Sequence, residues 1–344
     1  MENLSDVHVV LDIQKTVPPT NFGKLAVFVK STVNSFVEYS TQEEALSKES
    51  DIKLQNLIRG FFNQEEHANG LFVIKYDDLT KALDTYYSAN FEFMTVLTDD
   101  KSKGDVLTLS NYVEGKNTKF AVIGVSGVDQ VTPDTDVTTI LSPVLNLEGN
   151  SRTIAFVAGK DDIESAYAVG ALIGTCGNKT VGSITWKFKN LKGVKPINFT
   201  AFQLTEIHKV GAITYIEKSG IQQTSEGLTL GGEFIDALHG DDWVKSEIES
   251  SIQNLLSSSD KVSYDSNGIA QIQGVVTNVL MQATTNGIIL VNPETNSGSF
   301  SVIAKSRNEV SSVDIASRAY NGLSYTYTRA GAIHTVTVHG KVML

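Results

Sequence analysis

The chain has 344 residues, a formal net charge of −11, and 41% hydrophobic and 19% charged residues. This composition is typical of a folded globular protein and argues against long disordered segments. The negative charge disfavours nucleic-acid binding, which normally needs a basic surface. At this length we expect one large and one smaller lobe.

Cysteine content and apolar runs indicate where the protein is made. Cys176 is the only cysteine, so no disulfide can form within the chain, and its turn-like setting predicts a small buried side chain. The first residues lack a basic start, and the most apolar short stretch, 166–174, is much shorter than the ~20 residues of a membrane span. We therefore expect synthesis in a cytoplasm-like space, without a signal peptide and without direct membrane insertion.

Residues 1–21 are expected to form an extended N-terminal arm. Apolar side chains recur there with the two-residue period of a strand, at Val7, Val9, Leu11 and Ile13. The pair Pro18-Pro19 then ends the strand and fixes an extended exit. Because two prolines make a hairpin with the following residues difficult, this strand needs a distant partner or another molecule.

Strands and helices alternate between about residue 23 and residue 175. The apolar patterns predict strands at 25–29, 71–75, 91–97, 120–126 and 153–158, and helices at 54–62, 82–87, 107–113 and 163–173. This alternation favours a mostly parallel sheet covered on both faces. Three aromatic and β-branched segments follow, which we interpret as strands or a mixed region: 183–189, 197–204 and 212–219.

The last third of the chain predicts an α+β lobe. Asp241 and Asp242 are expected to open a helix and cap its first turn, with an apolar stripe from Val244 to Leu256. A second helix is expected around Ile272–Leu280, with strands at 287–291, 300–304 and 324–329. Alternation at the C-terminal end predicts a second strand arm without a local partner, which includes Ile333, Thr335, Val336, Val338 and Val342.

Neither the acidic residues nor the histidines indicate a catalytic or metal site. Acidic pairs at 77–78, 99–100, 161–162 and 241–242 favour capping and loop roles, because adjacent carboxylates seldom point at one spot. His334 and His339 are five residues apart on a predicted strand, so they project to opposite faces. His208 and His239 stand alone in the sequence, and a structural role is the better interpretation for each.

Glycine patterns do not indicate a cofactor site either. Gly124 and Gly127 follow a strand, but the third glycine of a dinucleotide fingerprint and a Walker lysine are both missing. Gly170 and Gly174 are typical of a helix packed tightly against a sheet. No nucleophile-elbow sequence is present. We therefore expect no cofactor, no metal and no enzymatic activity.

Several segments, taken in order, resemble contractile tail sheath proteins. They are SAYAVGALIG and GNKTVGSITWKFK within 165–189, GEFIDALHGDDW (232–243), KVSYDSNGIAQIQGVV (261–276), NGIIL (286–290) and RAGAIHTVTVHGKV (329–342). The later segments are similar to the C-terminal domain of sheath proteins from contractile phages and R-type bacteriocins. The chain departs from many of these proteins in its small size, which leaves little room for additional surface domains.

The resemblance implies a structural subunit of a contractile tail sheath, with an outer α/β domain and an inner, tube-facing α+β domain. The implied parts are an N-terminal arm (1–21), an outer sheath domain (22–231), an inner domain (232–331) and a C-terminal strand arm (332–344). Such subunits polymerise around an inner tube as six-membered rings in a helical array, and they contract to drive the tube through a cell envelope.

The resemblance also implies partners and a location. The partners are other copies of the chain, the tail tube protein, and baseplate and tail terminator proteins, with no nucleic acid among them. The location is a virion tail or a bacteriocin particle, after assembly in the host cytoplasm. Each arm would add a strand to a neighbouring subunit, which places subunit-interface residues at Val7, Val9, Leu11, Ile13, Ile333, Thr335, Val336, Val338 and Val342.

Two alternatives stay open at this point. A tail tube or baseplate component would also be acidic and poor in cysteine, although tube proteins are usually smaller and dominated by strands. A cytosolic α/β enzyme that binds a small molecule would require a deep polar pocket at the ends of the 25–29, 71–75 and 91–97 strands.

Overall fold

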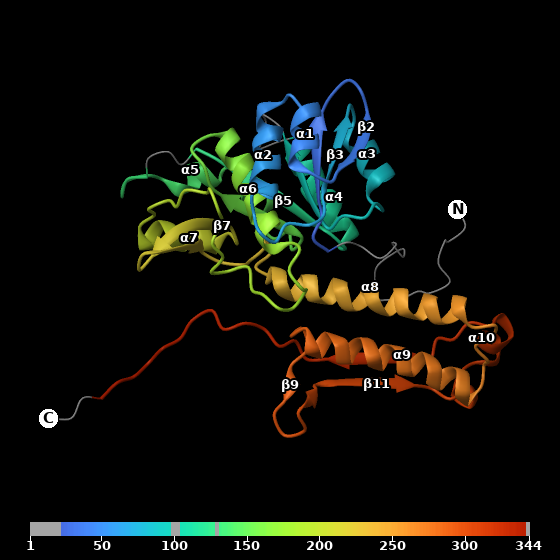
Figure 1. Cartoon of the computed structure of the whole chain (residues 1–344). Helices are drawn as coiled ribbons and strands as arrows, with labels where there is room; N and C mark the ends of the chain where they lie inside the picture. Colours follow the sequence, from blue (N-terminus) through green and yellow to red (C-terminus); the bar gives the residue numbers. More distant parts are fainter. Residues whose placement is uncertain (1–21, 98–103, 128–130, 342–344) are drawn as a thin grey trace.

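A large α/β lobe lies above a smaller lobe of two long helices and short strands (Figure 1). The computed structural model describes residues 22–97, 104–127 and 131–341. The predicted N-terminal arm, with Val7, Val9, Leu11 and Ile13, lies outside the described residues. The same holds for Val342 and for the acidic pair at 99–100.

The large lobe is built on an eight-stranded sheet of order β2-β3-β1-β4-β5-β6-β7-β8. The six inner strands run parallel, and the edge strands β2 and β8 are antiparallel to their neighbours. The strands are β1 (Leu25–Lys30), β2 (Ser35–Tyr39), β3 (Leu71–Tyr76), β4 (Phe93–Leu97), β5 (Phe120–Val125), β6 (Thr153–Val157), β7 (Ile213–Lys218) and β8 (Ile221–Thr224). The predicted mostly parallel sheet is confirmed.

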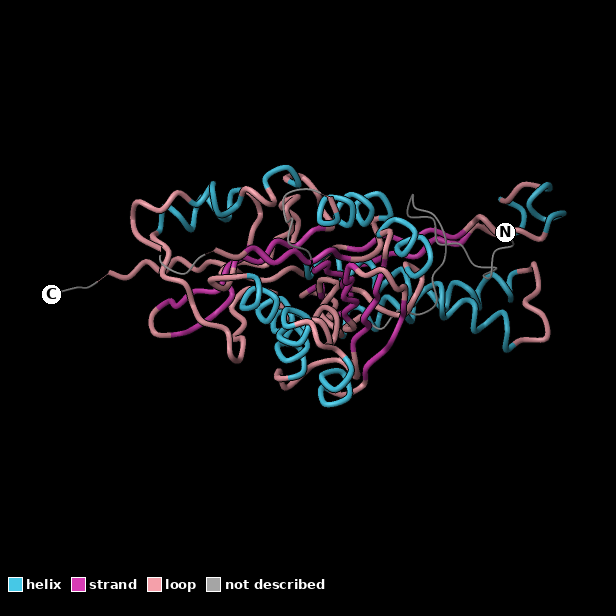
Figure 2. The backbone as a smooth tube through the Cα atoms, turned by 90° about the horizontal axis from the view of Figure 1, so that it is seen from above, coloured by secondary structure: helices cyan, strands magenta, loops and turns pink. Residues whose placement is uncertain are grey.

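Helices cover both faces of this sheet (Figure 2). One face packs against α1 (Gln42–Lys48), α2 (Ile52–Phe62) and α6 (Asp162–Cys176). The other packs against α3 (Leu79–Tyr86), α4 (Asp105–Lys116), α5 (Val137–Leu141), the 3-10 turn Leu145–Leu147 and α7 (Ala201–Lys209). Successive residues of each strand point into opposite cores, which explains the continuous apolar runs in the strand sequences.

The small residues of α6 pack against a helix, not against the sheet. A Cβ atom on Gly170 would overlap the carbonyl oxygen of Leu57 in α2, and one on Gly174 would overlap that of Phe61. In return, a Cβ atom on Gly60 would overlap the carbonyl oxygen of Tyr167 in α6. The sequence-based prediction of tight packing is confirmed, but the predicted partner is wrong, because the glycines allow two helix backbones to approach each other.

Gly124 has a packing role of the same kind. A Cβ atom there would lie 2.6 Å from the Ser165 hydroxyl oxygen and 3.0 Å from a methyl group of Val169, both on α6. Gly124, which lies within β5, therefore lets α6 lie close to this strand.

Between residues 180 and 230, three segments were predicted as strands or a mixed region. The structure forms a strand in one of them. Residues 212–219 contain β7, whereas 183–189 contains no strand and 197–204 runs into α7. The hydroxyl of Thr200 accepts from the Gln203 backbone N–H, and the Gln203 side chain accepts from the Thr200 N–H, which forms a capping box. The T-x-x-Q spacing was the local signal for this helix, and the aromatic content of the segment hid it.

The smaller lobe packs two long helices against a two-stranded sheet. Its elements are α8 (Ile235–Ser258), α9 (Ser266–Thr285), β9 (Val291–Asn292), β10 (Ser297–Gly298), β11 (Phe300–Ala304), a 3-10 turn (Arg307–Glu309), α10 (Ser312–Ser317) and β12 (Leu323–Tyr327). A third apolar core lies between α8, α9 and the β11–β12 sheet. The predicted strand at 287–291 is mostly absent, since Ile289 makes only an isolated bridge to Arg329.

The start of α8 corrects the predicted role of the acidic pair at 241–242. The helix begins at Ile235, so Asp241 and Asp242 lie inside it and cap nothing. By contrast, Asp78 and Asp161 do cap α3 and α6, as the pattern predicted. The acidic pair of α8 is instead bound by distant basic residues, which leads to the surfaces described next.

Candidate assembly interfaces

A cluster of charged side chains is buried where α8 meets the large sheet. Glu92, Lys119 and Arg152 directly precede β4, β5 and β6. Because these strands are parallel neighbours, the three residues lie together at the N-terminal ends of the central strands. Arg152 donates to both carboxylate oxygens of Asp242 in α8, with its Nη2 bond at 3.0 Å. Its Nε donates to Asn117 at 2.6 Å. This ion pair connects the two lobes.

Burial favours the neutral form of each acid and of the lysine in this cluster. It therefore raises the pKa of the acids and lowers the pKa of the lysine. Burial, followed by the nearby Asp242 carboxylate, raises the pKa of Glu92 well above its usual range. Burial raises the pKa of Asp242 to about 6, although the Arg152 guanidinium opposes the shift. Burial also lowers the pKa of Lys119 to about 8. Because charges are costly to bury, the arrangement favours one fixed geometry of the joint.

His239, one turn before Asp242 on α8, completes the joint on its apolar side. Its ring lies edge-on to Phe93 at 5.5 Å and to Phe120 at 6.1 Å, and it contacts Phe22 at 5.6 Å. Burial lowers the pKa of His239 to about 4, so the ring is neutral at physiological pH. The buried position fits the structural role predicted for this histidine, whereas its Nε2 has no hydrogen-bond partner among the described residues.

The β11–β12 sheet offers two open edges. Its strands pair antiparallel from Phe300 opposite Tyr327 to Ala304 opposite Leu323. The bonds from Thr328 N–H to Ser299 and from Lys305 N–H to Gly322 fix the odd-numbered β11 residues as the hydrogen-bonded positions. The backbone groups of the alternate residues therefore point outward. On the β11 side, the outward carbonyl of Val302 accepts from the Gln273 side chain of α9 at 3.3 Å. Neither strand has a further strand partner within the part of the chain that the structure describes.

The C-terminal segment leaves the smaller lobe through a short anchored stretch. Asp241 accepts from the Tyr327 hydroxyl and from the Nε and Nη2 of Arg329, with the Nε bond at 3.2 Å. The backbone N–H of Ala330 donates to Ile288 at 2.9 Å. Beyond His334 the segment runs away from the body (Figure 1). In the acidic pair of α8, Asp242 therefore binds the large lobe through Arg152, and Asp241 binds the start of the C-terminal segment through Arg329.

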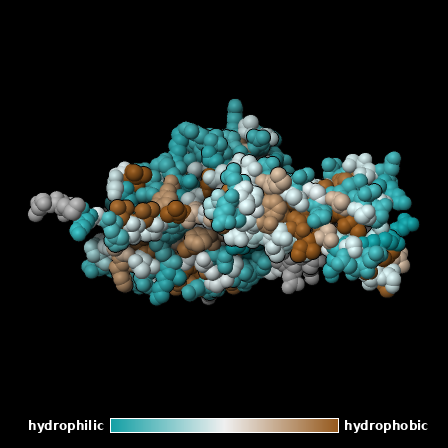
Figure 3. Space-filling model, turned by 90° about the horizontal axis from the view of Figure 1, so that it is seen from below, coloured by the Kyte–Doolittle hydropathy of each residue, from teal (hydrophilic) through white to brown (hydrophobic). Residues whose placement is uncertain are grey.

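The predicted interface residues of the C-terminal arm are exposed. Ile333, Thr335, Val336 and Val338 all face solvent, and residues 331–341 contain no strand. Figure 3 shows hydrophobic patches under the smaller lobe and near the start of the C-terminal segment. His334 is the exception in this arm, because its ring packs against the body. Sequence reasoning missed that contact, since its partners are more than 100 residues away.

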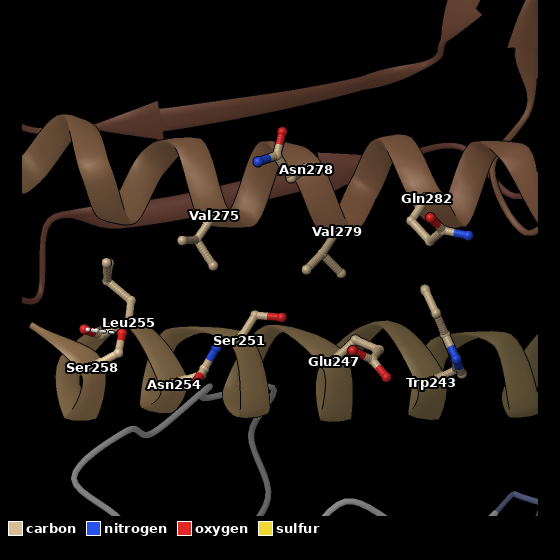
Figure 4. A pocket seen from close by; sticks show the side chains of 10 residues that line it. All are labelled: Trp243, Glu247, Ser251, Asn254, Leu255, Ser258, Val275, Asn278, Val279 and Gln282. Atoms are coloured by element: carbon tan, nitrogen blue, oxygen red, sulfur yellow. Dashed lines mark hydrogen bonds between the residues drawn. The ribbon is translucent and has the colours of Figure 1, made fainter.

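A groove with a volume of about 450 Å³ runs between α8 and α9. Figure 4 shows Val275 and Val279 of α9 pointing toward α8, while Trp243 and Leu255 point back toward α9. Polar groups line the rim, and Glu247 is the one charged side chain among the lining residues. The sequence of α9 itself contains no charged residue over its length.

The described residues contain little that could support ligand chemistry. No group of three or more histidine, cysteine, aspartate or glutamate side chains within them could hold a metal ion. A cavity at the carboxyl ends of β4 and β5 measures about 30 Å³, which is room for roughly one water molecule. Cys176 is buried, and burial raises the pKa of its thiol to about 12. Within the same ranges, no helix is long and apolar enough to cross a membrane.

Comparisons with known proteins connect these surfaces to a family. Residues 235–342 match the family described as E217 tail sheath protein gp31-like, C-terminal domain. This segment is similar in sequence to the C-terminal domain of a tail sheath protein. The resemblance drawn from the sequence of the last third is thereby confirmed. No curated protein matches the chain in sequence.

Solved structures extend the match in fold to the whole chain. The contracted sheath complex of an extracellular contractile injection system, PVC, is similar with a TM-score of 0.67 at 13% identity, over 99% of this chain and 98% of that one. The contracted helical sheath of the anti-feeding prophage has a TM-score of 0.64 at 11% identity, over 100% and 99%. A chain of the anti-feeding prophage baseplate has a TM-score of 0.64 at 12% identity, over 100% and 99%. The predicted fold class is confirmed.

Proposed function

We propose that this chain is the sheath subunit of a contractile injection device. The observation that carries the proposal is the tail-sheath C-terminal domain at 235–342, set in a chain whose fold matches contracted sheaths from end to end. The subunit polymerises around an inner tube, and its contraction drives the tube through an envelope. The work comes from repacking of subunits, with no catalytic step.

Strand exchange is the proposed way in which subunits are connected. Each edge of β11–β12 can accept a strand from another copy, and on the β11 side the added strand would displace the Gln273 side chain from the Val302 carbonyl. The arms at 1–21 and 332–344 supply the alternating sequences. Each backbone hydrogen bond contributes a net of roughly 0.5–1.5 kcal/mol, so a strand of a few residues holds a neighbour reversibly. Repeated over a lattice, such contacts make a strong mesh.

The two lobes correspond to the proposed outer and inner domains of the sheath subunit. The outer domain (22–231) and the inner domain (232–331) would move together, because the buried Arg152–Asp242 pair connects them. Other copies form six-membered rings in a helical array. Baseplate and tail terminator proteins bind the two ends of the sheath, and the particle is a virion tail or a bacteriocin assembled in the host cytoplasm.

The α8–α9 face is the proposed contact with the tube protein. Interface centres are depleted of charge, and the exposed side of α9 offers Asn267, Gln271, Asn278 and Gln282 without a single charge. Asn278→Lys should weaken binding to tube polymers, because it places a charge on this uncharged surface. Self-polymerisation of the variant should be unchanged. If tube binding is retained, the tube contact lies elsewhere.

Electron microscopy of the purified protein tests the function directly. Hollow, regularly striated tubes are expected from the full-length chain as its concentration rises, alone or with the tube protein. Deletion of 1–17 or of 333–344 should leave a folded monomer that no longer polymerises. A full-length chain that stays monomeric with tube protein present would contradict the sheath function, and tubes from either deletion would contradict the roles of the arms.

A further inference from the structure

One residue of the C-terminal segment is bound to the body while its neighbours are exposed. The side chain of His334 is 14% exposed, whereas Ile333 is 78% and Val336 is 74% exposed. Its Nε2 lies 2.8 Å from the Thr185 hydroxyl, and its Nδ1 lies 3.2 Å from a carboxylate oxygen of Glu226.

Aromatic rings and a second charge complete the His334 site. The rings of Phe234 and Phe188 meet the imidazole edge-on, with centroids at 5.1 Å and 6.1 Å. Lys187 binds the other carboxylate oxygen of Glu226 and so holds that acid in place. These partners come from the segment between α6 and α7 and from the residues between β8 and α8, so the site belongs to the large lobe and its connection to α8.

The chain between the Arg329 anchor and His334 makes little contact with the body. Gly331, Ala332 and His334 border a cavity of about 420 Å³ that is also lined by residues 182–185 and by Asp236. Gly331 has a φ of +67°, and a Cβ atom there would meet nothing within 4 Å. The segment is therefore attached at two points, with a glycine turn and an unfilled space between them.

We propose that His334 is a releasable clip that gives the C-terminal arm two take-off points. This inference rests on the proposed sheath function. With the imidazole in its site, the free arm begins at Thr335. With the imidazole out, it begins at Gly331, and the connection to the neighbouring subunit is longer by four residues, roughly 13 Å when extended.

Release is feasible because the clip is one side chain, whereas the exchanged strand is held by several backbone hydrogen bonds. A pull on the arm during subunit rearrangement would therefore open the clip before the strand leaves its sheet. The Arg329–Asp241 pair and the Ala330 backbone bond would then hold the new take-off point. The clip thus lets one arm span two inter-subunit distances without breaking the connection.

Nitroxide mobility in the full-length monomer tests the clip without requiring assembly. A spin label on Val336→Cys reports on the arm just beyond the clip, and the native Cys176 is buried. His334→Ala should narrow the nitroxide spectrum, because the arm is then free from Gly331. His339→Ala removes the same residue type from the same segment and should leave the spectrum unchanged. Equal spectra for His334→Ala and the parent would overturn the clip.

The assembled state provides the second readout. Among polymers of the unlabelled variants, His334→Ala should shift the population toward the helical state with the longer inter-subunit connection, while His339→Ala matches the wild type. Identical populations in all three would overturn the two-length role. Failure of the wild type to form any sheath would count against the proposed function, and the mobility measurement would still decide whether the clip exists.

Discussion

The carboxylate of Asp242 is bound by a guanidinium 90 residues earlier in the chain. Its neighbour Asp241 binds Arg329, 88 residues later. The acidic pair before an apolar stripe predicted a helix cap, because capping is decided by local sequence. A non-local partner cannot be recognised from spacing, and so both the start of α8 and the role of its acids were misassigned.

Removal of one member of the buried pair should destabilise the chain strongly. Arg152→Met leaves Asp242 without its partner in a buried site, and breaking such a pair costs about 3–5 kcal/mol. Urea unfolding of the monomer measures the loss. Glu44→Gln removes the exposed Glu44–Lys48 pair and should cost less than about 1 kcal/mol. A small effect of Arg152→Met would mean that the joint contributes little to stability.

Lys119 should make stability depend on pH in the alkaline range. Burial lowers its pKa from 10.5 to about 8, so between these values the unfolded chain holds a proton that the folded chain has lost. Stability therefore rises with pH through that window, by on the order of 2–3 kcal/mol, and is insensitive to this group below it. Several tyrosines whose pKa values are raised by burial lower the stability of both proteins near pH 10, so the contribution of Lys119 is measured as a difference. In thermal unfolding between pH 7 and pH 10.5, the stability of the wild type relative to Lys119→Met should rise.

The glycine contact between α2 and α6 should tolerate no side chain. Gly170→Ala places a methyl group against the Leu57 carbonyl, and overpacking of this kind costs typically 1–3 kcal/mol. Gly115→Ala, in an exposed turn of α4 with nothing within 4 Å, should be neutral or stabilising by up to about 1 kcal/mol. Denaturant midpoints of the two variants should move in opposite directions.

At the scale of elements, the sequence was most informative where burial produces a regular run or period of apolar residues. The strands 25–29, 71–75, 120–126 and 153–158 could be predicted because both of their faces are buried. The segment at 183–189 has the same aromatic content but forms no strand. Its Trp186 is buried next to Phe93, and its backbone carbonyl accepts from the Thr224 hydroxyl. Side-chain burial without strand pairing has no periodic signature.

The exposed face of β11–β12 should control polymerisation without affecting the fold. Ile303→Lys places a charge on the open sheet at a side chain that is 61% exposed, and edge charges oppose strand addition. The monomer should lose less than about 0.5 kcal/mol, because the side chain is not part of the core. Sedimented polymer should decrease. Val313→Lys on α10, with a side chain that is 73% exposed, is the matched control and should polymerise normally.

At the scale of the whole molecule, the terminal arms define the limit of what a single chain can show. Their alternating sequences predict strands, yet residues 331–341 form none when the chain is alone. A strand needs a partner for its backbone hydrogen bonds, and here the proposed partner is another copy. The interface residues at Ile333, Thr335, Val336 and Val338 therefore stay a proposal that only assembly can test.

The net charge of −11 should make assembly depend on salt. Like-charged subunits repel one another over about 10 Å at 0.1 M ionic strength and over about 30 Å at 0.01 M. Strand addition and apolar packing depend little on salt, so screening should favour the polymer. We expect the amount of sedimented polymer and the rate of its formation, followed by light scattering, to rise between about 10 mM and 100 mM NaCl. Dissociation over the same range would show instead that ion pairs between subunits outweigh the backbone contacts of the arms.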